Sequence, residues 1–385
     1  MIRRGSRAPA IALPLAAILM LAACAGPGAG GSAGGSGVFK IGFTGTLSGE
    51  FASYAVEMRQ GVELAVDEIN AAGGVEGARV EIVVADDRGE PSQGPVVAQR
   101  FCDDEDIKVV LGYSFSSVAL AAVPVYDRCG LPVLASAVTS PDLSGSSRYF
   151  FRNVLTDAVQ GAQMGRYAVD VLGFRRIATL HQVDDYGNGV NAAFESAVRE
   201  AGGEIVSSDG YQLGTKDFRG QLTRIDSVDP DAIFVGGFYP EAAKIAEQAR
   251  DLGLGQRILG TDGSLSPDLI ALGGESVEGM ILYGLFHPSL ESPEVQRFVS
   301  SFEERFGQEP SSWSALAYDA VYAVKAAVEL AGGTSRDDVR EGLAGVENVP
   351  GVTGPTSFNE EGDRITNVLF LTVRDGEFVP AEKQL

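Results

Sequence analysis

The chain of 385 residues is long for one hydrophobic core and predicts about two domains. Its formal net charge of −22, without a basic cluster, excludes nucleic-acid binding because such a surface repels phosphate groups. The content of 45% hydrophobic and 21% charged residues is typical of a globular chain.

The N-terminus has the parts of a bacterial export signal. Three arginines within the first seven residues precede an apolar run over residues 8–23, which is short for a membrane-spanning helix and is broken by prolines. The run ends in a leucine, two alanines and Cys24, which resembles a bacterial lipobox. This resemblance implies that a lipoprotein signal peptide, residues 1–23, is cleaved and that Cys24 carries the lipid. The alternative is a plain signal peptide with an incidental cysteine. Residues 24–37, almost all Gly, Ala and Ser, are expected to form a flexible tether.

After the tether, β-branched apolar runs alternate with amphipathic runs, which predicts successive strand and helix units. The expected strands of the first series cover residues 38–43, 80–85, 107–111 and 132–135, and its helices cover 53–72, 91–103 and 118–129. A second series begins near residue 153, with helices over 157–172, 187–201, 217–228 and 241–252 and strands over 176–181, 204–208, 232–236, 257–260 and 277–283. The pattern predicts an α/β fold of two doubly wound lobes of similar topology. Neither series contains GxGxxG between a strand and a helix, which disfavours a dinucleotide site.

The C-terminal part contains too few strands for a third domain. Its helices, over residues 293–306, 313–330 and 336–343, and its strands, over 356–358 and 366–373, are expected to complete the two lobes. The chain then crosses between lobes near residues 152, 283 and 354. Lobe 1 is expected to comprise residues 38–152 plus 285–353, and lobe 2 residues 153–284 plus 354–385. Three crossing segments form a hinge that can close around a ligand. Trp313 is expected to pack in the core or at the rim of the cleft rather than to form a platform for a ligand.

Serines follow the strand over residues 107–111. Ser114, Ser116 or Ser117 can cap the next helix. The free amides of that first helical turn, together with the hydroxyls, also suit a carboxylate or a phosphate. The residues alone leave capping and anion binding open.

Two cysteines remain after Cys24. Cys102 and Cys129 each lie near the end of a predicted helix, and the two helices are consecutive crossovers of one sheet. Because an exported chain lies in an oxidising compartment, we expect a disulfide between them, which contributes about 3 kcal/mol. The alternative is two buried free thiols. A zinc site is disfavoured, since the chain has no CxxC and only two histidines.

The sequence offers no constellation for catalysis. His181 closes a predicted strand, but no GxSxG elbow accompanies it, and a lone histidine there is usually structural. The acidic pairs at residues 86–87 and 184–185 suit caps of loops and helices better than calcium ligation. We therefore expect a protein that is not an enzyme and that uses no cofactor and no metal.

Short sequences along the whole chain after residue 37 resemble the branched-chain amino-acid-binding proteins of ABC importers. They comprise residues 41–49 with Tyr54, the helix end at 67–75, and the pieces at 86–87, 116–117, 132–141, 184–187, 236–238 and 260–263. The resemblance implies a type I periplasmic-binding-protein fold whose two lobes close on one small ligand. It also implies a first-lobe disulfide, although Phe115 stands where the leucine-binding protein has one of its cysteines.

The resemblance assigns ligand-binding residues in both lobes. In lobe 1, Ser116, with Ser117 beside it, falls where the ligand carboxylate is held, and the carbonyl of Ala137 and the hydroxyl and amide of Thr139 fall on the neighbouring loop. In lobe 2, Asp262 falls where an acid pairs with the α-ammonium group. The aromatic walls fall on Tyr54, Tyr186 and Phe238.

The physical chemistry of an amino acid fits these assignments. A zwitterion needs hydroxyls and amides at one end and a fixed negative group at the other. Asp262 lies in a turn-forming sequence, so its alternative role is to bond its own backbone. Phe238 provides an apolar wall and indicates apolar or aromatic ligand side chains.

The sequence therefore predicts a monomeric, lipid-anchored, extracytoplasmic solute-binding protein. Its ligand is expected to be an apolar amino acid, branched-chain or related, and its partners the permease subunits of an ABC importer. The alternatives are the same fold binding urea, a short amide or an aromatic acid, or a ligand-sensing receptor module that signals to a partner protein.

Overall fold

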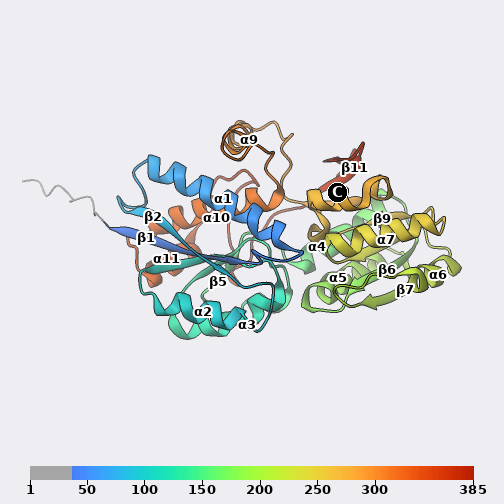
Figure 1. The fold of residues 1–385 in the computed structure, drawn as a ribbon, viewed down its shortest axis with the longest axis horizontal. Coiled ribbons are helices and arrows are strands. Elements are labelled where there is room, and N and C mark those ends of the chain that lie inside the picture. Colours follow the sequence, from blue (N-terminus) through green and yellow to red (C-terminus); the bar gives the residue numbers. More distant parts are fainter. Residues whose placement is uncertain (1–36) are drawn as a thin grey trace, which may run out of the picture. The chain divides into compact units, whose positions relative to one another are not determined.

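Two β-sheets organise residues 37–385, the part of the chain that the computed structural model describes (Figure 1). One sheet has five strands in the order β2-β1-β3-β4-β5, and the other has seven in the order β12-β11-β10-β9-β8-β6-β7. We use lobe 1 and lobe 2 for the parts built around the five-stranded and the seven-stranded sheet. The predicted signal peptide and the lipidation site Cys24 lie outside the described residues. Within residues 37–385, no helix combines the length and the apolar character needed to cross a bilayer.

Lobe 1 is a parallel sheet covered by helices that come from two distant parts of the sequence. Its strands are β1 (Val38–Gly45), β2 (Arg79–Asp86), β3 (Ile107–Gly112), β4 (Val133–Ala135) and β5 (Phe150–Arg152). Its helices are α1 (Ala52–Ala71), α2 (Gly94–Asp103), α3 (Ser116–Cys129), α9 (Pro293–Phe306), α10 (Ser312–Ala331) and α11 (Arg336–Gly345). Helix α10 packs on α1 and on α11, and α2 packs on α3 (Figure 1). The continuous apolar run of β3 is buried on both faces, which is typical of a central parallel strand.

Lobe 2 is parallel except at one edge. Its strands are β6 (Arg176–Gln182), β7 (Glu204–Tyr211), β8 (Ala232–Gly236), β9 (Arg257–Leu259), β10 (Ile281–Gly284), β11 (Leu369–Arg374) and β12 (Glu377–Pro380). Its helices are α4 (Asp157–Arg166), α5 (Asp185–Glu200), α6 (Arg219–Ser227), α7 (Tyr239–Asp251) and α8 (Pro267–Gly273). The C-terminal strand β11 pairs antiparallel with β10, and β12 pairs antiparallel with β11 at the edge of the sheet.

The structure corrects several predicted elements. The predicted strand at residues 356–358 is absent as a strand: Thr356 and Phe358 form only isolated bridges, with Val349 and Arg364. The predicted strand at 277–283 begins only at Ile281, after a short 3₁₀ turn. Strands β5 and β12 and helix α8 were not predicted, because each is short and none shows an alternating or helical apolar pattern over enough residues.

Two buried arginines hold the chain where it passes between the lobes. Arg152, fully buried at the end of β5, pairs with Asp363 at 2.6 Å and donates to the carbonyl oxygen of Ser140 at 2.8 Å. Arg364 donates to the carbonyl oxygens of Asn153 at 2.9 Å and of Thr353 at 2.9 Å. Buried charges are tolerated only when paired and hydrogen-bonded, so these contacts fix the position of both crossing segments.

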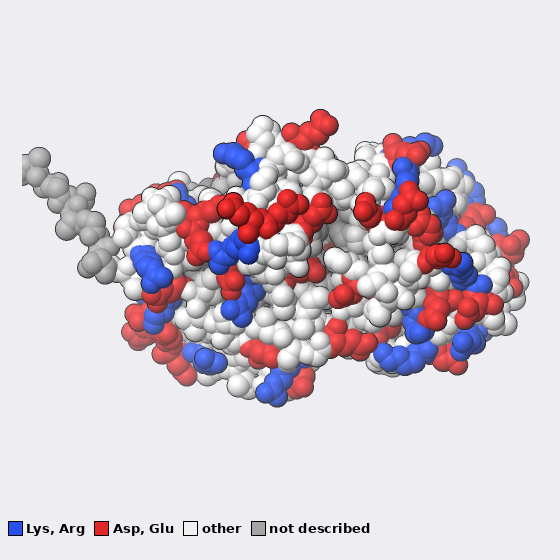
Figure 2. Space-filling model, turned by 45° about the horizontal axis from the view of Figure 1, so that its top comes forward, with Lys and Arg blue, Asp and Glu red and all other residues white. Residues whose placement is uncertain are grey.

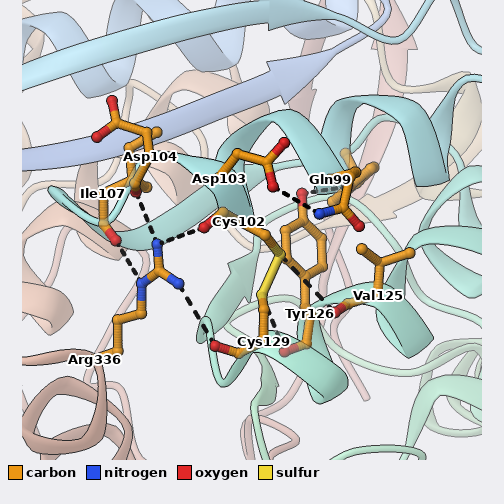
Figure 3. Close-up of a disulfide and its surroundings, with 10 residues drawn as sticks. Gln99, Cys102, Asp103, Asp104, Ile107, Val125, Tyr126, Cys129 and Arg336 are labelled. Carbon is orange, nitrogen blue, oxygen red and sulfur yellow. Dashed lines mark hydrogen bonds between the residues drawn. A yellow bond between two sulfur atoms is a disulfide. The ribbon is translucent and has the colours of Figure 1, made fainter.

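The predicted disulfide between Cys102 and Cys129 is present in lobe 1 (Figure 3). It joins the ends of α2 and α3, whose two Cα atoms lie 6.0 Å apart, a usual separation for a bridged pair. Figure 3 shows Arg336 reaching the same corner, where it donates to the carbonyl oxygens of Ile107 at 2.9 Å and Asp104 at 2.8 Å. The bridge and Arg336 together fasten α2, α3, α11 and the start of β3.

Candidate functional site

A narrow cavity lies between the two lobes, at the carboxyl ends of their parallel strands. Residues from both lobes line it: Tyr54, Ser114, Ser116, Ala137, Tyr186, Phe238, Asp262, Gly263 and Trp313. The carboxyl ends of parallel strands are where open α/β sheets bind ligands. All but two of the predicted ligand-binding residues line this cavity; Ser117 and Thr139 do not.

The lobe 1 wall begins at the glycine that ends β3. Gly112 has φ +126°, and a side chain there would collide with the carbonyl of Thr44, so only glycine lets the chain turn into the wall. The helix that follows has Phe115 at its N-cap and no side-chain cap, so the structure does not support capping by a serine, one of the two alternatives that the sequence left open. Ser116 instead accepts hydrogen bonds from the backbone N–H groups of Thr139 at 3.3 Å and Ser140 at 3.2 Å. Because its oxygen serves as the acceptor, its proton is available to an anionic group in the cavity.

Two of the three other predicted residues of this wall, Thr139 and Ser117, do not line the cavity. Thr139 is buried, and its hydroxyl has no partner among the described residues. Ser117 is half-buried and does not line the cavity. Ser114, which was considered only as a helix cap, does line it, and its hydroxyl oxygen accepts from the N–H of Thr46 at 3.1 Å.

Asp262 provides the charged group of the lobe 2 wall. It follows β9 in a 3₁₀ turn, Asp262–Ser264. Its Oδ1 accepts from the hydroxyl of Tyr186 at 2.7 Å and from the N–H of Gly263 at 2.8 Å, whereas Oδ2 is buried with no partner. One oxygen therefore holds the turn, and the other is left for a donor in the cavity. Burial raises the pKa of Asp262, opposed by the hydrogen bond from Tyr186.

A second acid near Asp262 escaped the sequence reasoning. Asp157 is fully buried at the start of α4, and neither of its carboxylate oxygens has a partner among the described residues. Burial, and then the charge of Asp262, raise the pKa of Asp157 well above its ordinary value. Thr156 is the N-cap of the same helix, and an acid in the first turn is common at helix starts. The sequence therefore contains no sign that Asp157 is a buried acid near the site.

Within the described residues, no lysine or arginine lines the cavity. Asp262 thus presents an unpaired buried oxygen to a cavity whose described lining has no cation, whereas Asp157 does not line the cavity and its negative charge is partly offset by Arg152. A bound cationic group would pair with Asp262 and relieve its repulsion with Asp157.

Aromatic rings form the rest of the cavity. Phe238 stacks on Tyr186, with ring centroids 5.1 Å apart. Trp313 donates from Nε1 to the carbonyl oxygen of Leu265 at 3.0 Å and lies edge-on to Tyr54. Trp313 packs as predicted, and it also lines the cavity, a place from which it could contact a ligand and which the prediction had disfavoured.

Direct contacts join the two lobes around the cavity. The hydroxyl of Tyr54 donates to the carbonyl oxygen of Gly263, and the hydroxyl of Tyr239 donates to the carbonyl oxygen of Glu50 at 2.6 Å. The lobes are therefore closed on the site in this structure.

The other candidate groups lie in structural roles. Asp184 accepts from the N–H of Gly187 at 2.7 Å as the N-cap of α5, and Asp86 accepts from the N–H groups of Leu47 and Arg88. Within residues 37–385, no group of three or more His, Cys, Asp and Glu side chains is placed to hold a metal ion. His181 on β6 is about half-buried and does not line the cavity.

Comparison with known proteins agrees with this architecture. The family described as periplasmic binding protein matches residues 38–377. The chain belongs to the periplasmic binding protein family. This membership implies an extracytoplasmic location and places the chain among substrate-binding proteins rather than enzymes.

Relatives of this periplasmic binding protein have named ligands. It is 30% identical, over 84% of its length and 86% of the relative's, to the leucine-, isoleucine-, valine-, threonine- and alanine-binding protein of Pseudomonas aeruginosa. A leucine-binding protein from Thermotoga maritima superposes with a TM-score of 0.84 at 31% identity, covering 89% of this chain and 97% of that one. A branched-chain amino acid transporter substrate-binding protein from Streptococcus pneumoniae, in complex with isoleucine, gives a TM-score of 0.83 at 30% identity with the same coverage. The predicted type I periplasmic-binding-protein fold is confirmed.

Proposed function

We propose that this protein is the solute-binding component of an ABC importer and that it closes on an apolar α-amino acid of the branched-chain class. The observation that carries the proposal is the polarity of the cavity. A hydroxyl with an available proton, Ser116, lies on one wall, and a buried carboxylate oxygen without a partner, on Asp262, lies on the other. A zwitterion satisfies both ends at once.

The roles of the remaining residues follow from their places. Ser116 holds the ligand carboxylate through its hydroxyl proton, and the hydroxyl of Thr139 on the neighbouring loop, which has no partner among the described residues, supports it. Asp262 holds the ammonium group, with Asp157 adding negative charge nearby. Tyr54, Phe238 and Trp313 enclose the apolar side chain, and the named ligands of the relatives are of this size and polarity.

The rest of the proposal concerns delivery. The chain is anchored through a lipid on Cys24 and presents its ligand to the permease subunits of the importer. The lobe ranges 38–152 plus 285–353 and 153–284 plus 354–385 describe the two bodies that close.

Acidic side chains are spread over the visible face with basic ones among them (Figure 2), in keeping with the net charge of −22. The permease surface that meets such a protein is expected to carry complementary positive charge.

A thermal-shift screen tests the ligand class. Leucine, isoleucine and valine at 100 times their dissociation constants should stabilise the protein by about 2.7 kcal/mol. Urea, acetamide and benzoate serve as comparison ligands because none is a zwitterion. A melting temperature that rises with benzoate or urea and with none of the amino acids would contradict the proposal.

A matched variant separates the charge of Asp262 from its shape. Asp262→Asn keeps the size of the side chain and its bond to Tyr186, and should abolish most of the leucine-induced shift. An unchanged shift in this variant would return Asp262 to a purely structural role in the turn.

A further inference from the structure

The ring of Phe115 lies directly behind the apolar wall of the cavity. Phe115 is buried at the N-cap of α3 and does not itself line the cavity. Its ring centroid is 4.8 Å from that of Phe238, which does line it, and 5.3 Å from that of Phe51 at the start of α1. Phe115 therefore supports a wall residue of lobe 2 from lobe 1.

Phe238 has little freedom on its other side. Its ring stacks on Tyr186 at 5.1 Å with an interplanar angle of 23°. The hydroxyl of Tyr186 is held in place because it donates to Oδ1 of Asp262 at 2.7 Å and lies 2.8 Å from the hydroxyl oxygen of Thr261. Away from Tyr186, the ring of Phe238 faces Phe115, Phe51 at 5.8 Å and Tyr54 at 6.0 Å, and Phe115 is the nearest of these and so the closest limit on its movement.

Phe115 cannot retreat, because it rests on a glycine backbone. A Cβ placed on Gly89 would lie 2.6 Å from Cε2 and 2.9 Å from Cδ2 of the Phe115 ring. Gly89 has φ +68°, a conformation that favours glycine.

The loop that carries Gly89 is itself fixed. The fully buried Asp87 accepts from the N–H of Gly89 at 2.9 Å and from the hydroxyl of Thr44, on β1, at 3.2 Å. The acidic pair at residues 86–87 thus serves to hold the surface on which Phe115 rests.

We propose that the contact series from Gly89 through Phe115 to Phe238, the Gly89 buttress, sets how far the apolar wall can retreat and so limits the ligand to amino acids with aliphatic side chains. Phe115 is in this view a specificity-determining positioning residue that never touches the ligand. The inference rests on the proposed function, since it concerns the size of the side chain of the same ligand class. It assigns a role to Phe115 and Gly89, neither of which lines the cavity.

The test compares leucine with phenylalanine as ligands. Binding of each is measured by isothermal titration calorimetry in the wild-type protein and in Phe115→Leu, which shortens the support and lets Phe238 move back. We expect the ratio of phenylalanine affinity to leucine affinity to rise about tenfold or more, the scale on which hydrophobic pockets discriminate between side chains that differ by a methylene.

Phe101→Leu is the matched control. Phe101 is a fully buried phenylalanine of α2 in the same lobe, with no ring contact to Phe238. It should leave the affinity ratio at its wild-type value. An unchanged ratio in a folded Phe115→Leu protein, or an equal change in both variants, overturns the inference while leaving the amino-acid ligand in place. Absence of binding by either amino acid in the wild-type protein overturns the proposed function and the inference with it.

Gly89→Ala probes the same contact from the opposite side and serves also if Phe115→Leu does not fold. The added methyl group must push the Phe115 ring towards Phe238, so leucine binding should weaken more than binding of free alanine. Equal weakening of the two ligands would contradict a role in side-chain size.

Discussion

The two walls of the cavity are built from different chemistry. Lobe 1 contributes hydroxyls and backbone amides, and its polar residues there hold one another, as Ser116 does with the N–H groups of residues 139 and 140. Lobe 2 contributes buried acid, with an oxygen of Asp262 left unpaired. Burying the uncharged wall of lobe 1 costs little free energy. Burying the unpaired carboxylate of Asp262 costs much more unless a cation binds to it. Under the proposed function, this difference would give an amino-acid ligand one orientation and would link closure to its ammonium end.

The largest effect is expected from removal of the charged wall. Asp262→Ala should weaken leucine binding by about 2–5 kcal/mol, because the ammonium group is then buried without its partner. The melting temperature of the ligand-free protein should change much less than the affinity, since loss of the repulsion between Asp262 and Asp157 offsets loss of the two hydrogen bonds that Oδ1 accepts. Calorimetry and thermal melting measure the two quantities. Asp185→Ala, which removes an exposed acid at the start of α5, is the control and should leave both quantities near their wild-type values.

The next effect separates the scaffold of lobe 1 from its wall. A Cys102→Ser, Cys129→Ser double variant should lose about 3 kcal/mol of unfolding free energy through the freed loop. The wall residues lie at the other end of α3 from Cys129, so the leucine affinity of the folded protein should stay near the wild-type value. Urea denaturation with and without leucine measures both. A large loss of affinity together with normal stability would contradict this separation.

The uncharged wall should respond less strongly than the acidic one. Ser116→Ala should cost about 1.5–3 kcal/mol of leucine affinity, the range for a hydrogen bond to a charged group. Ser117→Ala, one residue along the same helix, should change it by no more than about 0.5 kcal/mol because Ser117 does not line the cavity. Equal losses in both variants would show that the helix start as a whole, rather than one hydroxyl, holds the carboxylate.

The smallest effect concerns an acid on lobe 1 that is not part of its wall. Burial raises the pKa of Glu57 on α1 to about 7 from 4.5, with the Ser311 hydroxyl lowering it and Asp268 of α8 raising it. A carboxyl group with a raised pKa stabilises the folded form fully below pH 4.5, and this contribution is lost as the pH rises to 7. The loss should be about 1–2 kcal/mol, because the side chain is partly exposed and screened.

Glu57→Gln isolates this contribution from the other buried acids. The difference in unfolding free energy between the variant and the wild-type protein should grow in favour of the variant from pH 4.5 to 7. A difference that stays constant across this range would contradict the shifted pKa.

The sequence predicted the alternation of strands and helices well because apolar periodicity is a local property. The run from Val109 to Leu111 could only be a buried strand, and the α9 boundaries Pro293–Phe306 match the prediction. Short elements such as β5 are set by packing of Phe150 and Phe151 into an existing core, which no local pattern records.

The candidate site residues were assigned through the resemblance to a family. The points that the sequence missed or left open have physical reasons. Ser116 was considered as a cap because hydroxyls before an apolar helix usually are caps, yet the amides of residues 139 and 140, distant in sequence, compete for its oxygen. Asp157 stayed hidden in a helix-start sequence, and its unpaired state follows only from the fold around it. The position of the Phe115 ring depends on its close contact with Gly89. This contact joins segments that are distant in the sequence, so the spacing of residues along the chain does not reveal it.

The packing of α10 on α1 has a consequence for synthesis. A Cβ on Gly61 of α1 would collide with the carbonyl of Ser314, so the two helices meet at close range, although about 250 residues separate them in the chain. A ribosome releases the strands of lobe 1 early and α10 late, so the apolar face of α1 stays uncovered during most of translation. Nascent chains that stop before residue 312 should therefore bind holding chaperones, and those that include α10 should release them.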